Sequence, residues 1–180
     1  MSFEFVTARL RIRPWRAVDR PALEQMVRDP DMMRHIARGR TWTDEQVDEL
    51  LERQARHLAE HGVCFGAVEL MATGEVIGLA GMQRLDDCRF ELGWWIWKAH
   101  WGRGYATEAA QAFVTHARDV MGLDQLVAVI DPPNAASIRV AERLGMAFES
   151  LRSARETLAR REDVPVACYV MNLPRPPEGQ

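Results

Sequence analysis

Two glycines near the middle of the chain occupy a place where proteins often bind phosphate. Gly102 and Gly104 follow a segment with the pattern of a β-strand and come directly before a helical pattern. Backbone N–H groups at the start of a helix lack partners and carry partial positive charge, so such a loop can bind an anion. Thr107 adds a hydroxyl donor and Arg103 adds a positive charge. The segment predicts a pyrophosphate-binding loop, although two glycines also suffice to turn a strand into a helix.

Two familiar phosphate loops do not fit the sequence. No segment matches G-x-x-x-x-G-K-[ST], the loop of P-loop nucleoside triphosphatases. The dinucleotide fingerprint G-x-G-x-x-G needs a third glycine at the position of Thr107. That fingerprint also follows the first strand of a parallel unit, whereas the strand before Gly102 is the last of three consecutive predicted strands. A Rossmann-type nucleotide site is therefore disfavoured.

The elements that must position this loop are predicted from apolar periodicity and from capping residues. Strands are predicted at residues 6–13, 63–71, 76–82, 90–97, 126–130, 146–152 and 166–173. Helices are predicted at residues 19–29, from Thr43 to Gly62, from the glycine loop to Gly122, and from Asn134 to Gly145. The strand at residues 90–97 is apolar on both faces, as in the centre of a sheet. The order β-α-α-β-β-β-α-β-α-β-β predicts an α/β fold of mixed α+β type, with helices on a mixed sheet.

The composition indicates one globular unit. With 180 residues, of which 47% are hydrophobic, the chain is long enough to bury a sizeable core. We expect a single domain over residues 1–173 and a disordered, proline-rich tail at residues 174–180. The net charge of -3 and the pI of about 6.0 lack the basic excess of nucleic-acid binders, so nucleic acid is not an expected partner.

No feature predicts a membrane location, export or a metal site. Residues 1–15 alternate polar and apolar types, unlike the apolar core of a signal peptide, and no apolar run approaches the ~18 residues of a membrane span. Cys64, Cys88 and Cys168 are too widely spaced for a disulfide framework or a C-x-x-C metal site, and we expect them to be buried thiols. A cytoplasmic protein without a metal is expected.

The glycine loop resembles that of a known family, the GNAT acetyltransferases. Their pyrophosphate loop has the pattern [QR]-x-x-G-x-[GA], and residues 101–106 match it at Gly104 and Ala106. Trp101 replaces the usual Gln or Arg, and an aromatic residue there is similar to the RimJ/RimL-like branch. The resemblance extends through residues 7–15, 77–81 and 134–145, and so covers nearly the whole chain.

The resemblance implies the GNAT fold, in which a mostly antiparallel mixed sheet splays apart between its fourth and fifth strands, and acetyl-CoA as the co-substrate. The pantetheine arm would pair with the backbone of three strand residues, namely Trp94, Trp95 and Ile96. The pyrophosphate would be held by Gly102, Arg103, Gly104, Tyr105, Ala106 and Thr107. Asn134 and Ser137 would meet the pantetheine from the next helix. Alternatively, Asn134 is only a helix cap and Ser137 an ordinary first-turn residue.

Amine acetylation needs a proton acceptor, a donor for the oxyanion and a proton for the leaving thiolate. Glu91 is the candidate base, because burial in an apolar strand raises the pKa of a carboxyl group toward neutrality; pairing with Arg84 or Arg89 is the alternative. In the family, a backbone N–H near Trp95 or Ile96 would bind the oxyanion.

Two of the family's usual proton-transfer residues are absent. The tyrosine acid falls at Ala141, and the fifth-strand carboxylate of ribosomal-protein acetyltransferases falls at Val129. Ser137, a water molecule or Tyr105 would have to replace the acid. His35 and Arg34 precede the helix predicted from Thr43 to Gly62. They either reach the acceptor site or are solvated loop residues.

The expected function is transfer of an acetyl group from acetyl-CoA to a primary amine by direct transfer in a ternary complex. The acceptor would be a protein N-terminus, an amino sugar, a polyamine or an antibiotic. Because the acid and one carboxylate are absent, a non-catalytic acyl-CoA-binding or regulatory module of the same fold is the alternative. Cyclic dimers are the commonest assemblies, so a homodimer is the oligomer to consider.

Overall fold

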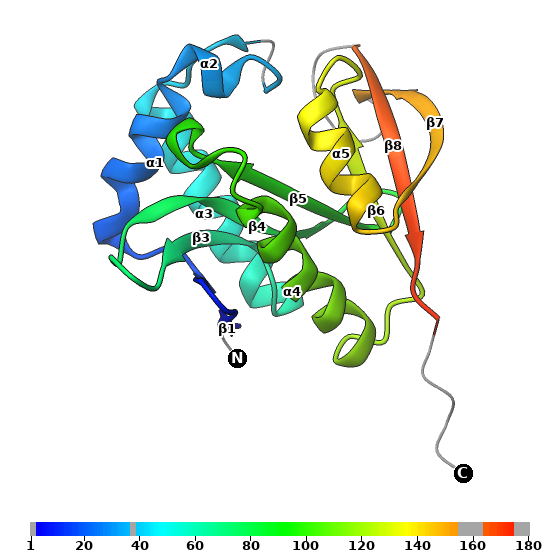
Figure 1. Ribbon diagram of the computed structural model, residues 1–180. Coiled ribbons are helices and arrows are strands. Elements are labelled where there is room, and N and C mark those ends of the chain that lie inside the picture. The colour runs from blue at the N-terminus through cyan, green and yellow to red at the C-terminus, as the bar shows by residue number, and fades with distance from the viewer. Residues whose placement is uncertain (1–2, 37–38, 155–163, 175–180) are drawn as a thin grey trace.

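The computed structural model describes residues 3–36, 39–154 and 164–174, whose strands form one mixed sheet of order β1-β2-β3-β4-β5-β6-β8-β7 (Figure 1). The strands are β1 (Phe5–Val6), β2 (Leu10–Arg13), β3 (Phe65–Leu70), β4 (Val76–Arg84), β5 (Phe90–Ile96), β6 (Gln125–Ile130), β7 (Ala147–Ser153) and β8 (Pro165–Asn172). The helices are α1 (Arg20–Val27), α2 (Pro30–Met33), α3 (Asp44–His61), α4 (Tyr105–Asp119) and α5 (Ala135–Arg143), with the 3-10 turns η1 (Ala17–Asp19) and η3 (Lys98–His100). The predicted mixed α/β class is confirmed.

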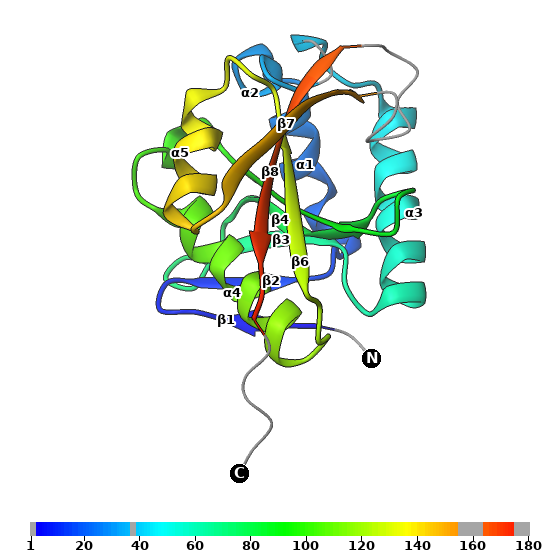
Figure 2. The ribbon, with the colours of Figure 1, turned by 90° about the vertical axis from the view of Figure 1, so that its right-hand side faces the viewer.

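Helices cover both faces of the sheet, because successive residues of its central strands point to opposite sides (Figure 2). On β5, Leu92, Trp94 and Ile96 belong to the larger hydrophobic core, which includes side chains of α4. Trp95 points to the other face and packs in a second core with Leu79 and with side chains of α1 and α3. The strand β5 is therefore covered on both sides, as its apolar sequence predicts.

The sheet opens between β5 and β6. These strands run parallel and pair at Glu91 and Val127, near their amino ends. β5 is paired along its length with β4, and β6 is paired antiparallel with β8. Toward their carboxyl ends β5 and β6 separate, as Figure 1 shows. This is the predicted divergence between the fourth and fifth strands.

The strand predicted at residues 6–13 was wrong, because this segment is a hairpin of β1 and β2. Phe5 and Val6 of β1 pair antiparallel with Ile12 and Arg11 of β2. Thr7 closes the turn: its backbone N–H donates to Leu10 O at 2.9 Å, and its Oγ1 accepts from the Leu10 N–H at 3.0 Å. A threonine hydroxyl that bonds the backbone competes with a continuous strand.

The predicted helix boundaries depend on local caps, and these are present. Thr43 and Gln46 form a capping box at the start of α3, which ends at Gly62 with φ of 74°. Asn134 Oδ1 accepts from the Ser137 N–H at 3.1 Å at the start of α5. The short helix α2 was not predicted. It begins at the N-cap Asp29, and its four residues are too few for an apolar periodicity to be recognised.

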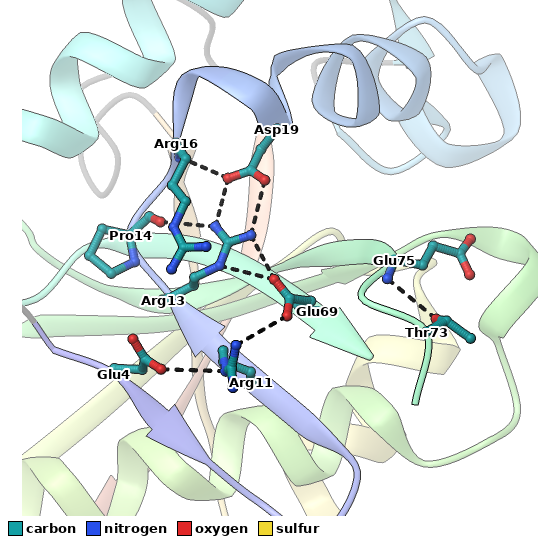
Figure 3. A network of polar contacts seen from close by, with 9 residues as sticks. All are labelled: Glu4, Arg11, Arg13, Pro14, Arg16, Asp19, Glu69, Thr73 and Glu75. Atoms are coloured by element: carbon teal, nitrogen blue, oxygen red, sulfur yellow. Dashed lines mark hydrogen bonds and ion pairs between the residues drawn. The ribbon is translucent and has the colours of Figure 1, made fainter. Parts of the chain in front are cut away.

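A buried cluster of charges joins β2 to β3 and to η1 (Figure 3). Arg13 Nη1 and Nη2 donate to the two carboxylate oxygens of Asp19 at 2.6 and 3.0 Å. Arg13 Nη2 and Nε also donate to Glu69 Oε2 at 2.7 and 3.1 Å. Asp19 Oδ2 accepts from the backbone N–H of Arg16 at 2.7 Å. One buried guanidinium is thus shared by two carboxylates, and Arg11 Nη1 lies 3.6 Å from the other oxygen of Glu69.

The burial of Arg13 departs from the alternation along β2, which places this residue with Arg11 on the face opposite to Leu10 and Ile12. Its exposed fraction is 3%, and that of Asp19 is 4%. Burial opposes ionisation of Asp19, but the hydrogen bonds from Arg13 and Arg16 outweigh it, so the pKa of Asp19 is lowered. Arg13 is covered because η1 folds back over β2 and supplies Asp19, an arrangement that the periodicity of β2 alone does not contain.

The cysteines differ in exposure. Cys64 and Cys168 are buried, and burial raises the pKa of Cys64 to about 12. Cys88 is exposed, which corrects the expectation that it is buried; it lies in the turn between β4 and β5 with φ of 69°. Within the described ranges, no helix is long and apolar enough to cross a membrane. Residues 175–180 of the predicted tail lie outside the described residues.

Candidate active site

The predicted phosphate loop connects η3 to α4. Gly102 and Gly104 have φ of 74° and 80°, in the left-handed region that favours glycine. Gly104 is the N-cap of α4, and no side chain caps the first turn. A Cβ built on Gly102 would meet nothing within 4 Å, and one on Gly104 would meet the Arg9 guanidinium at 3.6 Å. Residues 102–104 are exposed, and no side chain caps the first N–H groups of α4, which an anion could therefore bind.

The turn between β1 and β2 binds this loop and the first turn of α4. Arg9 Nε donates to Glu108 Oε2 at 2.7 Å, and the Arg9 backbone N–H donates to Glu108 Oε1 at 2.9 Å. Thr7 Oγ1 donates to Glu108 Oε1 at 2.6 Å. Arg9 Nη1 also donates to the carbonyl of Arg103 at 2.9 Å, and the guanidinium lies 4.5 Å from the centre of the Tyr105 ring. The clamp residues Thr7, Arg9 and Glu108 therefore hold both the loop and the first turn of α4.

The clamp also determines the ionisation of Glu108 at the start of α4. Burial opposes ionisation of Glu108, but hydrogen bonds from Thr7 and Arg9 outweigh it and lower the pKa of Glu108. The carboxylate stays ionised, and its charge is neutralised by Arg9 rather than directed at the open side of the loop. The sequence contained the Thr-x-Arg segment, but nothing local connects it to a residue 99 positions away.

For the acetyl-CoA site that the family resemblance implies, replacement of Arg9 by alanine is expected to raise KM for acetyl-CoA roughly tenfold, with kcat little changed, because a lost charged hydrogen bond is worth about 1.5–3 kcal/mol. Arg9→Lys should recover only part of the loss, since lysine cannot reach Glu108 and the Arg103 carbonyl as a planar fork. Arg11→Ala is the matched control, because Arg11 contacts Glu4 and Glu69 and not the loop. Steady-state kinetics with acetyl-CoA varied gives both constants; a fall confined to kcat would contradict the clamp.

The backbone of β5 presents hydrogen-bonding groups toward the opening. The Trp97 N–H donates to Ile77 O of β4 at 2.7 Å. Because the ladder of an antiparallel pair alternates, the N–H groups of Trp94 and Ile96 point to the other edge, where β6 diverges, and the backbone of Trp95 pairs with β4. Trp101 is 56% exposed and its Nε1 donates to Ile96 O at 2.5 Å, so its indole ties the loop to the end of this edge.

Glu91 is buried at the narrow end of the opening. Its exposed fraction is 7%, and its carboxylate accepts a hydrogen bond from Gln83 Nε2 on β4. Arg89, proposed above as a pairing partner, contacts Asp87 and Glu149. By the alternation of side chains along a strand, Glu91 shares a face with Trp95. A carboxylate thus faces the side of β5 that is opposite to α4.

The remaining predicted positions lie across the opening, around α5. Asn134 caps this helix through Ser137, whose side chain is half-buried in the first turn. Ala141, the position of the missing tyrosine, has an exposed fraction of 0% and faces the core. In the part of the chain that the structure describes, no group of three or more His, Cys, Asp or Glu side chains could hold a metal.

A sheet that opens between two parallel strands, with a glycine loop at the start of the helix between them, is the architecture of an acetyltransferase that uses acyl-CoA. The chain belongs to the GNAT acetyltransferase family, whose domain, described as "Acetyltransferase (GNAT) domain", matches residues 9–147. It is an N-acetyltransferase, and members of this family take the acetyl group from acetyl-CoA. The family and fold predicted from the sequence are confirmed.

Relatives agree with this assignment. The uncharacterized protein YkkB of Bacillus subtilis (strain 168) is 31% identical over 170 residues, which are 92% of this chain and 94% of YkkB. An acetyltransferase structure from Agrobacterium tumefaciens str. C58 is 28% identical, with a TM-score of 0.80 over 94% of each chain. RimL, a ribosomal L7/L12 alpha-N-protein acetyltransferase solved with coenzyme A, shares the fold at 18% identity, with a TM-score of 0.76 over 94% of this chain and 97% of RimL.

Proposed function

We propose that the protein transfers the acetyl group of acetyl-CoA directly to a primary amine bound in the same complex. The observation that carries this proposal is the uncapped, glycine-containing start of α4, placed at the end of the strand where the sheet opens. This arrangement offers an anion site for the pyrophosphate and, beside it, a strand edge for an extended arm. The pyrophosphate would be held by Gly102, Arg103, Gly104, Tyr105, Ala106 and Thr107.

The pantetheine arm would lie along the open edge of β5. Trp94 and Ile96 direct their backbone groups to this edge, whereas Trp95 contributes its side chain to the opposite face from α4. The cap residue Asn134 and Ser137 would meet the arm from the start of α5. The Ile96 N–H is the better placed donor for the oxyanion, since the backbone of Trp95 is used by β4.

Glu91 would accept a proton from the amine, directly or through a water molecule. The amine nitrogen forms a bond with the acetyl carbon, and the carbonyl oxygen gains the negative charge that the Ile96 N–H stabilises. The C–S bond then breaks, and the thiolate takes a proton delivered by water, Ser137 or Tyr105. The acceptor class is a protein N-terminus, an amino sugar, a polyamine or an antibiotic.

The test separates an enzyme from an acyl-CoA-binding module without activity. CoA at a hundredfold excess over its Kd should stabilise either one by about 2.7 kcal/mol, read as a rise in Tm. Only the enzyme releases free thiol from acetyl-CoA when glucosamine, spermidine, kanamycin or a tripeptide with a free amino terminus is added. Absence of a Tm shift would refute the cofactor site, and a shift without thiol release would favour the module.

Gly104→Val is expected to abolish the Tm shift with CoA, because valine is strained at a φ of 80° and its side chain would cover the loop. Gly62→Val is the matched control: its φ is 74°, a Cβ there would meet nothing within 4 Å, and it ends α3 away from the loop. Both variants should lose stability, but only the Gly62 variant should keep the CoA response. A retained shift in Gly104→Val would contradict the pyrophosphate assignment.

A further inference from the structure

Two side chains from opposite sides of the opening meet at its wide end. His35 Nδ1 lies 2.6 Å from Asp131 Oδ2. His35 follows α2, and Asp131 directly follows β6, 96 positions further along the chain. Their side chains are 30% and 33% exposed, so the pair is in contact with solvent without being fully hydrated. We call these two residues the His35–Asp131 pair.

Ion pairs hold α2 across both diverging strands. Lys98, in the turn η3 after β5, lies 2.7 Å from Asp29 Oδ2 and 3.3 Å from Asp31 Oδ2. Arg34 Nη2 lies 2.9 Å from Asp31 Oδ1, so Arg34 is paired with Asp31 rather than with Asp131. The segment from Asp29 to His35 is thus tied by Lys98 to the turn after β5 and by Asp131 to the end of β6.

The strand register places this pair on the face of the sheet that carries Glu91. Glu91 and Val127 are register partners, and side chains two residues apart on a strand share a face. On β5 that face continues from Glu91 to Trp95, and on β6 it continues from Val127 to Asp131. Asp131 is therefore level with Trp95, where the strands have separated, and the His35–Asp131 pair lies four residues outward from Glu91.

The contact with Asp131 determines which nitrogen of His35 can accept a proton. A carboxylate that accepts from Nδ1–H favours the neutral tautomer in which Nε2 carries a lone pair, and it stabilises the imidazolium once Nε2 is protonated. This is the arrangement of a proton acceptor. The neighbouring charged groups have other partners: Asp29 and Asp31 pair with Lys98, and His100 of η3 lies 3.3 Å from Glu75.

We propose that His35, oriented by Asp131, accepts the first proton from the acceptor as it enters in the ammonium form. This inference rests on the proposed acetyl transfer. An ammonium substrate loses two protons overall. The first passes to His35 Nε2, directly or through water, and then to solvent, leaving the free amine. After the C–N bond has formed, the second passes from nitrogen to Glu91 and ends on the thiol when the C–S bond breaks.

The test compares two small amines that differ in their charge at neutral pH. Methylamine is protonated at pH 7, whereas methoxyamine is already neutral and has no first proton to lose. His35→Asn, which retains a donor for Asp131 but no proton acceptor, is expected to lower kcat/KM for methylamine about 100-fold. It should leave kcat/KM for methoxyamine nearly unchanged. The deficit with methylamine should shrink as the pH is raised toward the pKa of the amine.

Asp131→Asn should show the same selective loss at smaller amplitude, and His61→Asn, which changes a histidine next to Glu60 at the end of α3, should affect neither amine. An equal loss for both amines would indicate a structural role of the pair and overturn the inference, as would no loss for methylamine. The proposed function fails separately: wild-type protein would then release no thiol with either amine or with any amine of the panel above.

Discussion

Glu91→Gln is expected to lower kcat by about 10²–10⁴-fold, the usual contribution of a general base. The carboxylate is buried on the face of β5 that is turned away from α4, and Gln83 donates to it from the neighbouring strand. Glutamine has the same shape, and its carbonyl oxygen can still accept from Gln83, so the strand should remain intact while the proton acceptor is lost. The rate of thiol release at saturating acetyl-CoA and amine measures the effect.

The same variant must still respond to CoA. Because Glu91 is not part of the loop at the start of α4, the Tm shift with CoA should remain as in the wild type. Glu149→Gln, which removes a carboxylate on β7 that pairs with Arg89, is the matched control and should keep its activity. Unlike His35→Asn, the Glu91 variant should lose activity with methoxyamine as well as methylamine. A Glu91→Gln protein with normal kcat would remove this residue from the mechanism.

Arg13→Met is expected to destabilise the protein by about 3–5 kcal/mol, because it leaves the carboxylate of Asp19 buried without its cation and leaves Glu69 with only the more exposed Arg11. The side chain of Arg13 is 4% exposed and makes hydrogen bonds to both carboxylates. Urea unfolding followed by circular dichroism measures the free energy of unfolding. A loss this large is a substantial part of the stability of an ordinary domain.

Two further variants show whether the effect comes from burial. Arg20→Met, which breaks partly exposed ion pairs with Glu24 and Asp48, should change stability much less. A triple variant in which Arg13, Asp19 and Glu69 are all replaced by apolar residues should regain much of the loss, since no charge is then left buried. If Arg13→Met and Arg20→Met were equally mild, the cluster would not stabilise the fold as argued here.

Much of the fold could be predicted because its signals are local. The capping box of Thr43 and the N-cap Asn134 define helix starts through contacts with residues three positions on. Gly102 and Gly104 predict a loop because only glycine readily adopts their left-handed φ. Apolar alternation predicts the strands, and it failed where a side chain bonds the backbone, as Thr7 does in the first hairpin.

The sequence by itself therefore determined most of the helices and strands, their order and the loop at the start of α4, since each depends on residues within a few positions. Only the tertiary structure decided which charged groups meet. Arg9 finds Glu108, Arg13 is buried between Asp19 and Glu69, and His35 reaches Asp131. These contacts join segments far apart in the chain, and their energies depend on burial and geometry that exist only after the sheet and its helices have packed.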